Sequence, residues 1–275
     1  RVVVFGGGTG LSNIIGGDSR QQNWSDKPFE GLKKMFPRTK AIVCVTDDGG
    51  STGELLKDLP IFGLGDIRHV LVSSIQRRLL EARYNLTAGQ SLALVKDIAA
   101  IFNHRFTARP ESAEALLKGC FVDLEKLPQK MVSAFVSYLG FCLQDEMCAS
   151  TLGRPHCLGN LLILSVIRMA ADDEILNGER IEIDRSIGEA INGAISTIGE
   201  LVGTGADALE HETVVVEGRE DDDLEWPVRL VQQPCGRCEA VELGHVQVEE
   251  HKVEALGLEL LPGVAHALGR IGLLE

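Results

Sequence analysis

The first fifteen residues constrain the fold more than any other part of this chain. Residues 1–5 form a short apolar run rich in β-branched side chains, and the glycine-rich segment 6–10 follows directly. Apolar residues then recur at Leu11, Ile14 and Ile15, which is the spacing of an amphipathic helix. We therefore predict a buried strand, a glycine turn and the start of a helix. The free N–H groups at such a helix start make a seat for an anion, most often a phosphate.

The glycines match neither of the two best-known phosphate-binding fingerprints. A dinucleotide fingerprint would need a third glycine where Leu11 stands, and a P-loop would need Gly-Lys-Ser/Thr at residues 11–13. A tight strand-to-helix turn without a ligand therefore stays open as an alternative.

A second strand is predicted at residues 40–46, which are apolar and β-branched, as in a parallel strand covered on both faces. Residues 16–30 are polar and irregular, and we interpret them as an inserted loop. Strand, helix and strand in this order form a βαβ unit. The predicted fold class is therefore α/β, with a Rossmann-like, doubly wound and mostly parallel sheet.

Two adjacent acids, Asp47 and Asp48, follow the second strand and precede a Gly-Gly-Ser-Thr-Gly loop at residues 49–53. Carboxylates at the carboxyl end of a strand can hold magnesium or act as a base toward a hydroxyl. The alternative is an Asp-Gly turn with solvated acids. We favour the ligand role because open α/β sheets bind ligands in the crevice where this loop is expected.

The segment Gly65-Asp66-Ile67-Arg68 precedes a run with helical apolar spacing. Asp66 is predicted to be the N-cap of that helix. Arg68 in the first turn would be unfavourable for the helix dipole, which indicates an anionic partner. The segment is thus expected both to cap the helix and to face a ligand.

Residues 76–150 are predicted to form a helical insert or lid within the domain, with helices over 91–102, 112–117 and 127–143. His104 and Arg105 in this stretch are interpreted as a solvated helix end. We find no catalytic constellation there.

A buried helix is predicted at residues 161–167, and its start carries His156, Gly159 and Asn160. These residues could bind a second anion or the edge of a nucleotide base. Alternatively, His156 closes a loop and Asn160 caps the helix. A capping box at residues 186–189 predicts one more helix, and residues 213–218 and 227–231 are expected to be strands.

The composition excludes several classes of function. The net charge of −13 argues against a nucleic-acid-binding or anionic-membrane surface, although backbone amides can still hold a phosphate locally. We expect no membrane span and no signal peptide, because no apolar run approaches the ~20 residues that a span needs. The 7 dispersed cysteines suit a reducing cytoplasm. Cys235 and Cys238 have metal-like spacing, but a β-turn with two incidental thiols is the preferred interpretation.

Taken in order, four segments resemble one superfamily. They are residues 6–12, residues 46–53, residues 65–68, and His156 with Gly159 and Asn160. The superfamily contains the 2-phospho-L-lactate transferases of deazaflavin coenzyme synthesis and the related gluconeogenesis factors that bind UDP-sugars. The resemblance implies a Rossmann-like fold with a nucleoside-diphosphate group lying across the glycine loop. It also implies magnesium near the carboxylates that match Asp47 or Asp48 and Asp66.

The candidate site follows from these segments together. Expected catalytic residues are Asp47, Asp48 and Asp66, of which Asp48 and Asp66 would hold magnesium. Expected nucleotide- or phosphate-binding residues are Gly6, Gly7, Gly8, Thr9, Gly10, Ser51, Thr52, Arg68, His156, Gly159 and Asn160. The chain as a whole, residues 1–275, is predicted to be a single nucleotide-binding domain.

The chain departs from the family pattern in two places. The stretch 76–150 looks longer than in compact members, and the late Gly-Pro-Gly-Ser loop, another diphosphate contact, is not visible. Residues 261–268 resemble only what normally follows that loop. These departures bear on turnover more than on nucleotide binding.

Two functions stay open at this point. One is a transferase that moves a phospholactyl-type group from a GDP- or UDP-type donor to an acceptor hydroxyl with magnesium. The other is a regulator of carbon metabolism or the cell envelope that binds a UDP-sugar without chemistry. The expected partner is a nucleoside-diphosphate-linked small molecule, with no nucleic acid and no membrane, and a homo-oligomer is left open.

Overall fold

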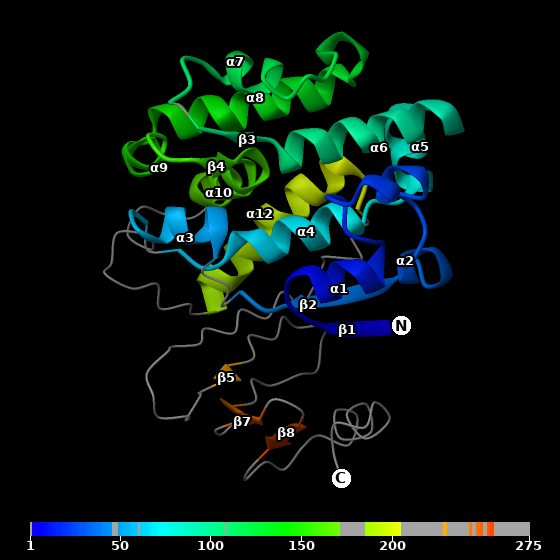
Figure 1. Ribbon diagram of the computed structural model, residues 1–275, viewed down its shortest axis with the longest axis vertical. Helices are drawn as coiled ribbons and strands as arrows, with labels where there is room; N and C mark the ends of the chain where they lie inside the picture. Colours follow the sequence, from blue (N-terminus) through cyan, green and yellow to red (C-terminus); the bar gives the residue numbers. More distant parts are fainter. Residues whose placement is uncertain are drawn as a thin grey trace. The chain divides into compact units, whose positions relative to one another are not determined.

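The computed structural model describes residues 2–45, 49–59, 61–107, 109–170 and 185–204, and short strands between residues 228 and 255. The chain divides into two compact units, Arg1–Thr213 and Val214–Glu275 (Figure 1). All the motif segments lie in the first unit. The single-domain organisation over residues 1–275 stays a prediction.

The predicted strand–helix–strand unit is confirmed at the N-terminus. Strands β1 (Val2–Gly6) and β2 (Thr39–Val43) pair in parallel, with Val4 opposite Ala41. Helix α1 (Gly8–Ile15) connects them and packs on α4 (Leu64–Ser73). The α/β class is therefore observed, as a helix-rich unit with a small parallel sheet, while the doubly wound sheet stays a prediction.

The first strand is less buried than its sequence predicts. Val3 and Phe5 of β1 are 43% and 59% exposed, whereas β2 is buried at all but one position. The expectation of a buried first strand is therefore wrong, because one face is exposed and the other three residues are only half-buried. An apolar run does not by itself reveal whether the second face of a strand is covered.

Two helices form the centre of the first unit. Every residue of α4 is buried, and so are the first eleven residues of α10, Leu158 to Arg168. A helix that is apolar around its whole circumference must be enclosed by other elements. Helix α10 accordingly contacts α4, α6, α8 and α12. Leu71, Leu161 and Ile167 are almost completely shielded from solvent.

Residues 76–150, which were predicted to be helical, are mostly helical in the structure. Figure 1 shows α6, α7, α8 and α9 on the far side of α4 and α10 from β1 and β2. Whether these helices are an insertion stays a prediction. The elements not yet given bounds are η1 (Gln22–Asp26), α2 (Leu32–Met35), α3 (Gly50–Leu56), α5 (Arg77–Tyr84), α6 (Ala88–Asn103), β3 (Arg105–Phe106), α7 (Ala113–Lys118), η2 (Leu124–Lys126), α8 (Gln129–Gln144), α9 (Glu146–Thr151), β4 (His156–Cys157), α10 (Leu158–Ala170) and α12 (Arg185–Val202).

The second unit is described only at four short strands. β5 (Val228–Arg229) pairs antiparallel with β6 (Glu242–Leu243), and β7 (Val246–Glu249) pairs antiparallel with β8 (Lys252–Ala255). β5 falls within the strand predicted at residues 227–231. The other predicted strand, at 213–218, and the pair Cys235 and Cys238 lie outside the described residues.

Within the described residues, no helix is both long enough and apolar enough to cross a bilayer. The cysteines of these ranges, among them Cys44 and Cys157, are free thiols.

A buried lysine ties the segment after α1 to the end of α4. Lys33 is only 4% exposed, and its Nζ donates to the Pro28 carbonyl at 2.8 Å and to the Ser73 carbonyl. Ser73 ends α4, so Lys33 satisfies one of the carbonyls that a helix leaves unpaired at its C-terminus. Burial lowers the pKa of Lys33 to about 7.

We expect Lys33 to make stability depend on pH. Between pH 7 and 10.5 the unfolded chain binds more protons at this lysine than the folded chain, because the folded pKa is the lower one. The free energy of unfolding should therefore rise with pH in this window, by at most about 1.4 kcal/mol per pH unit from this group. Urea denaturation of Lys33→Met at several pH values should show a smaller rise. Lys34→Met, at an exposed neighbour, is the control, and equal pH dependence of both variants would contradict the assignment.

Candidate functional site

The main cavity of the first unit lies where four helices begin. Its volume is about 440 Å³, and its walls come from the starts of α1, α3, α4 and α10, with contributions from the loop after α1 and from the end of α6. The lining residues are Gly7, Thr9, Arg20, Gly49, Gly50, Ser51, Thr52, Gly65, Asp66, Arg68, His69, Asn103, Arg105, Cys157 and Asn160. The first N–H groups of a helix have no partner within the helix, and each helix start carries a partial positive charge, so this arrangement favours an anion.

The turn between β1 and α1 brings bare backbone to the cavity. Gly7 is the N-cap of α1, in an extended conformation, and the helix begins at Gly8. A Cβ atom on Gly7 would lie 2.9 Å from Asp66 Oδ2 and 3.2 Å from Cys44 Cβ. Glycine at position 7 therefore allows the Asp66 carboxylate to approach this closely, and a side chain here would displace it. Thr9 also lines the cavity, whereas Gly6 and Gly10 are not among its described lining residues.

The start of α3 is tied to two other helix starts through hydroxyl groups. Ser51 Oγ accepts from the Cys157 backbone N–H at 2.8 Å and from Asn160 Nδ2 at 3.3 Å. Thr52 Oγ1 accepts from the Gly65 N–H at 3.1 Å. Both predicted hydroxyl residues thus line the cavity and also fix the relative positions of its helix starts.

Asp66 lies in the first turn of α4, but it is not the N-cap that we predicted. The N-cap is Gly63, and Asp66 is the third helical residue. Thr52 supplies the acceptor that a capping side chain would normally provide, so α4 is capped from α3. Asp66 is 7% exposed, lines the cavity, and stands at a helix end that favours negative charge.

Arg68 is buried at the base of the cavity and joins three helices. Its Nε donates to Asn160 Oδ1 at 2.9 Å, and its Nη1 donates to Asn103 Oδ1 and to the Phe102 carbonyl. All its partners within the described residues are neutral, so the expected anionic partner is not among them. Burial lowers the pKa of Arg68, and the positive charges of neighbouring arginines act in the same direction.

Gly159 makes room for this arginine. A Cβ atom on Gly159 would lie 2.7 Å from Arg68 Cδ and 2.6 Å from the Phe102 carbonyl oxygen. Gly159 does not line the cavity in the described residues, and its part in the site is to let the Arg68 side chain run past α10.

His69 adds a neutral imidazole to the same network. Arg68 Nη2 lies 2.9 Å from His69 Nε2, and since a guanidinium only donates, Nε2 must accept. Burial, followed by the charges of Arg68 and Arg20, lowers the pKa of His69 to about 3. His69 therefore carries its proton on Nδ1, which is buried and has no hydrogen-bond partner among the described residues.

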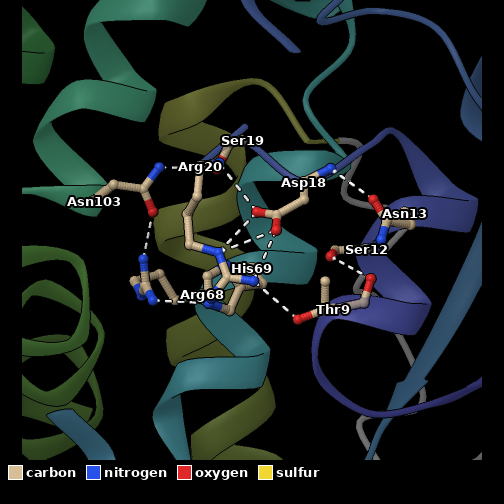
Figure 2. A network of polar contacts seen from close by, with 9 residues as sticks. All are labelled: Thr9, Ser12, Asn13, Asp18, Ser19, Arg20, Arg68, His69 and Asn103. Atoms are coloured by element: carbon tan, nitrogen blue, oxygen red, sulfur yellow. Dashed lines mark hydrogen bonds and ion pairs between the residues drawn. The ribbon is translucent and has the colours of Figure 1, made fainter. Parts of the chain in front are cut away.

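Arg20 reaches the cavity from the polar loop after α1. Figure 2 shows its guanidinium between Asp18 and Thr9, at 2.8 Å from Asp18 Oδ2 and 2.9 Å from Thr9 Oγ1. This pairing lowers the pKa of Asp18 through the hydrogen bond that Arg20 donates. The loop that we interpreted as an insertion is thus folded onto the start of α1.

Arg105 brings a further positive charge to the rim. It lines the cavity beside Gly50, where its Nη2 lies 3.6 Å from the position of an added Cβ, and Gly50 itself has a φ of +55°. The described residues give the Arg105 side chain neither an ion pair nor a hydrogen bond. Our interpretation of Arg105 as part of a solvated helix end is therefore incomplete, because the side chain stands at the cavity.

The other predicted residues fall outside the cavity or outside the described chain. His156 is fully buried, and its Nε2 lies 2.7 Å from the Thr151 carbonyl, which fits the alternative in which it closes a loop. Asp47 and Asp48 lie outside the described residues, so their roles stay predictions.

Several cavity residues were missed by the sequence analysis. His69 had a usable signal, because it follows Asp66 by three residues and must share its face of a helix. Asn103 and Arg20 had none, since one ends a long helix and the other sits in an irregular polar loop.

One family model covers the part of the chain that builds this cavity. The family model described as 2-phospho-L-lactate transferase CofD matches residues 2–176. Gluconeogenesis factors from Halalkalibacterium halodurans, Listeria monocytogenes and Bacillus subtilis are 47%, 39% and 38% identical over 72, 83 and 90 residues. These matches cover 26%, 30% and 31% of this chain but only 18%, 21% and 24% of the relatives. No solved structure matches at a significant level.

Proposed function

Because this chain belongs to the 2-phospho-L-lactate transferase CofD family, we propose that its main cavity binds the diphosphate of a nucleotide-linked small molecule. We further propose that the protein transfers a phospholactyl-type group from this donor to an acceptor hydroxyl. The nucleotide is expected to be of the GDP or UDP type.

The observation that carries this proposal is the charge of the cavity. Four helix starts, the side chains of Arg68 and Arg105, and Arg20 in its pair with Asp18 surround a space of about 440 Å³, whose described lining contains one acid, Asp66, in a chain whose net charge is −13. Concentrating positive charge in one cavity of an acidic protein favours an anionic ligand with several oxygens. A diphosphate is such a ligand, and its oxygens can accept from backbone N–H groups and guanidinium groups together.

Magnesium fits the described residues as an ion shared with the ligand. Asp66 lines the cavity, and the described residues contain no cluster of three or more His, Cys, Asp or Glu side chains that could hold a metal unaided. Magnesium commonly uses one or two protein carboxylates and completes its shell with phosphate oxygens and water. We propose that Asp66 and Asp48 hold it, and when bound it would neutralise charge on the diphosphate.

In the proposed transfer, the acceptor oxygen forms a bond to the phosphorus of the phospholactyl group. The bond from that phosphorus to the bridging oxygen breaks, and a nucleoside monophosphate leaves with that oxygen. The hydroxyl proton passes to a carboxylate, for which Asp47 or Asp48 is predicted. The arginines and helix starts contribute positioning and charge stabilisation, which are the main sources of catalysis in phosphoryl transfer.

A second candidate function has support from the relatives. The curated proteins that this chain resembles are named gluconeogenesis factors, a name that states no enzymatic reaction. The same cavity could bind a UDP-sugar in a regulator without chemistry. The predicted set of three carboxylates, Asp47, Asp48 and Asp66, favours the transferase, because a binder without metal gains nothing from acids that repel its ligand.

Replacing Asp66 by Asn should separate a role in magnesium binding from a role in the helix. We expect the free energy of unfolding to fall by about 1 kcal/mol or less, through a weaker interaction with the helix dipole. Magnesium-dependent ligand affinity should fall about tenfold or more, because the neutral amide is a poorer magnesium ligand. Calorimetry with and without magnesium measures this change. Unaltered magnesium dependence in Asp66→Asn would restrict Asp66 to the helix.

Enzyme and regulator are distinguished by product release. Purified protein would be incubated with an activated phospholactyl nucleotide, a deazaflavin acceptor and magnesium, and nucleoside monophosphate would be followed by chromatography. Release that depends on the acceptor supports the transferase. Absence of release, together with tight binding of a UDP-sugar, supports the regulator.

A further inference from the structure

Two arginines that line the main cavity have different kinds of partner. Arg20 donates from Nε and Nη2 to the Asp18 carboxylate, at 2.9 and 2.8 Å. Arg68 instead donates to two amide oxygens, to an imidazole nitrogen and to a backbone carbonyl, all of them uncharged. The charge of Arg20 is therefore balanced within the protein, whereas the described residues provide no ion pair that would balance the charge of Arg68.

The unbalanced charge of Arg68 is also buried. The residue is only 4% exposed, and a guanidinium in a protein does not lose its proton. Burying a cation without a counter-charge is unfavourable, and the neighbouring charges of Arg20 and Arg105 add to the cost. An anion that enters the cavity would offset this cost. The polar groups around Arg68 thus hold its side chain in place without cancelling the charge that attracts a ligand.

Asn103 is the partner of Arg68 that comes from outside the sequence motifs. It is the last residue of α6, is half-buried and lines the main cavity. Its Oδ1 accepts from Arg68 Nη1, and its Nδ2 donates to Ser19 Oγ at 2.9 Å. Figure 2 shows Asn103 between these two residues. The side chain therefore fixes the position of the guanidinium relative to α6 and to the loop after α1.

An aspartate at this position would make the same contacts. It has nearly the shape of asparagine, and its two oxygens would accept from Arg68 and from the Ser19 hydroxyl, which can rotate to donate. It would also form a charge-assisted hydrogen bond with the guanidinium, which is stronger than a neutral one. Hydrogen bonding alone therefore does not explain an amide here. The property that distinguishes asparagine from aspartate is that it leaves the charge of Arg68 uncancelled.

We propose that Asn103 is a positioning residue that selects for ligand charge: its neutral amide fixes the Arg68 guanidinium and leaves that positive charge to a ligand with two or more negative charges. The inference rests on the proposed function and deepens it, because it assigns to one residue the preference for a diphosphate over ligands with less charge.

The test compares two substitutions of similar size at Asn103. Asn103→Asp keeps both contacts, so the midpoint of urea denaturation should stay the same or rise. Its affinity for UDP or GDP should nevertheless fall by about tenfold or more, because the carboxylate cancels the charge of Arg68. Asn103→Leu removes the acceptor, so the midpoint should fall. Its affinity should fall by only about threefold, because Arg68 keeps its charge but is less well positioned.

The order of the two variants separates this role from a structural one. If Asn103 only supported the fold, affinity would follow stability and Asn103→Leu would bind more weakly than Asn103→Asp. The loss in Asn103→Asp should also grow with ligand charge, from within about twofold for the nucleoside, through the monophosphate, to the diphosphate. Asn85→Asp adds the same charge at an exposed residue after α5 and should leave the affinity within about twofold.

Calorimetry of these variants distinguishes a failure of this inference from a failure of the proposed function. Diphosphate binding by Asn103→Asp as tight as by Asn103→Leu, or an equal loss in Asn85→Asp, overturns the inference while diphosphate binding stands. Failure of both UDP and GDP to bind the unmodified protein overturns the proposed function and the inference with it.

Discussion

Replacing Arg68 by Met is expected to weaken both the fold and ligand binding more than any other single change at the cavity. The substitution leaves Asn160 Oδ1, Asn103 Oδ1 and His69 Nε2 without the donor that now satisfies them. Each unsatisfied buried acceptor costs about 1–3 kcal/mol, so the free energy of unfolding should fall by roughly 3 kcal/mol or more. Affinity for a nucleoside diphosphate should fall by at least about tenfold, because a buried positive charge is lost.

Urea denaturation and calorimetry measure the two effects separately. Arg68→Lys keeps the charge but loses the fork geometry, so it should retain the fold and lose less affinity than Arg68→Met. Arg78→Met, at an exposed arginine of α5, should change stability by no more than about 0.5 kcal/mol. If Arg68→Met left stability and affinity unchanged, the hydrogen bonds that Arg68 donates would not be what holds the cavity together.

Two glycines of the first turn should respond to alanine in opposite directions. A Cβ atom on Gly7 would meet Asp66 and Cys44 at 2.9 and 3.2 Å, whereas one on Gly10 would meet nothing within 4 Å. Gly7→Ala should therefore cost about 1–3 kcal/mol of stability and displace the Asp66 carboxylate. Gly10→Ala, inside α1, should instead stabilise the protein by about 0.5–1 kcal/mol.

Ligand binding should follow the same division. Gly7→Ala should lower the affinity for a nucleoside diphosphate by about tenfold or more, because Gly7 lines the cavity. Gly10 is not among the described lining residues, so Gly10→Ala should leave the affinity unchanged. Calorimetry of both variants checks this. A loss of affinity in Gly10→Ala as large as in Gly7→Ala would mean that the ligand lies elsewhere along the turn.

The sequence predicted the parts of the fold that depend on local pattern. The βαβ unit, the buried helix α10 and the helices within residues 88–144 all follow from apolar periodicity, and the structure confirms them. The family resemblance, read from four short segments, is also confirmed. Local pattern could not reveal that one face of β1 is open, because that depends on which elements pack against it.

The cavity was predicted only where its residues belong to the motifs. Gly7, Ser51, Asp66, Arg68 and Asn160 were placed in the site from the sequence, and the structure gathers them around one space. Asp66 was given the wrong helix position because Thr52, from a different helix, satisfies the start of α4. A cap supplied by a distant residue leaves no mark in the local sequence.

The residues that sequence could not find come from distant segments. Arg20 and Asn103 are separated from the motifs by loops and long helices, and only the folded chain brings them to the same wall. Arg105 was interpreted as part of a solvated helix end, because nothing in its local sequence shows that its side chain, at the start of β3, reaches Gly50. The charge of a cavity depends on the fold, and the charged residues that line it need not belong to a sequence motif.

If the helix starts and arginines of the main cavity hold a diphosphate, the protein must bind a nucleoside diphosphate more tightly than the nucleoside. The most direct test is isothermal titration calorimetry of the protein with UDP and GDP, each compared with its own nucleoside, in the presence of magnesium. We predict that at least one diphosphate binds about 100-fold or more tightly than its nucleoside, and that Arg105→Ala removes about tenfold or more of this difference. Equal binding of nucleoside and diphosphate, or no binding of either diphosphate, would contradict the account.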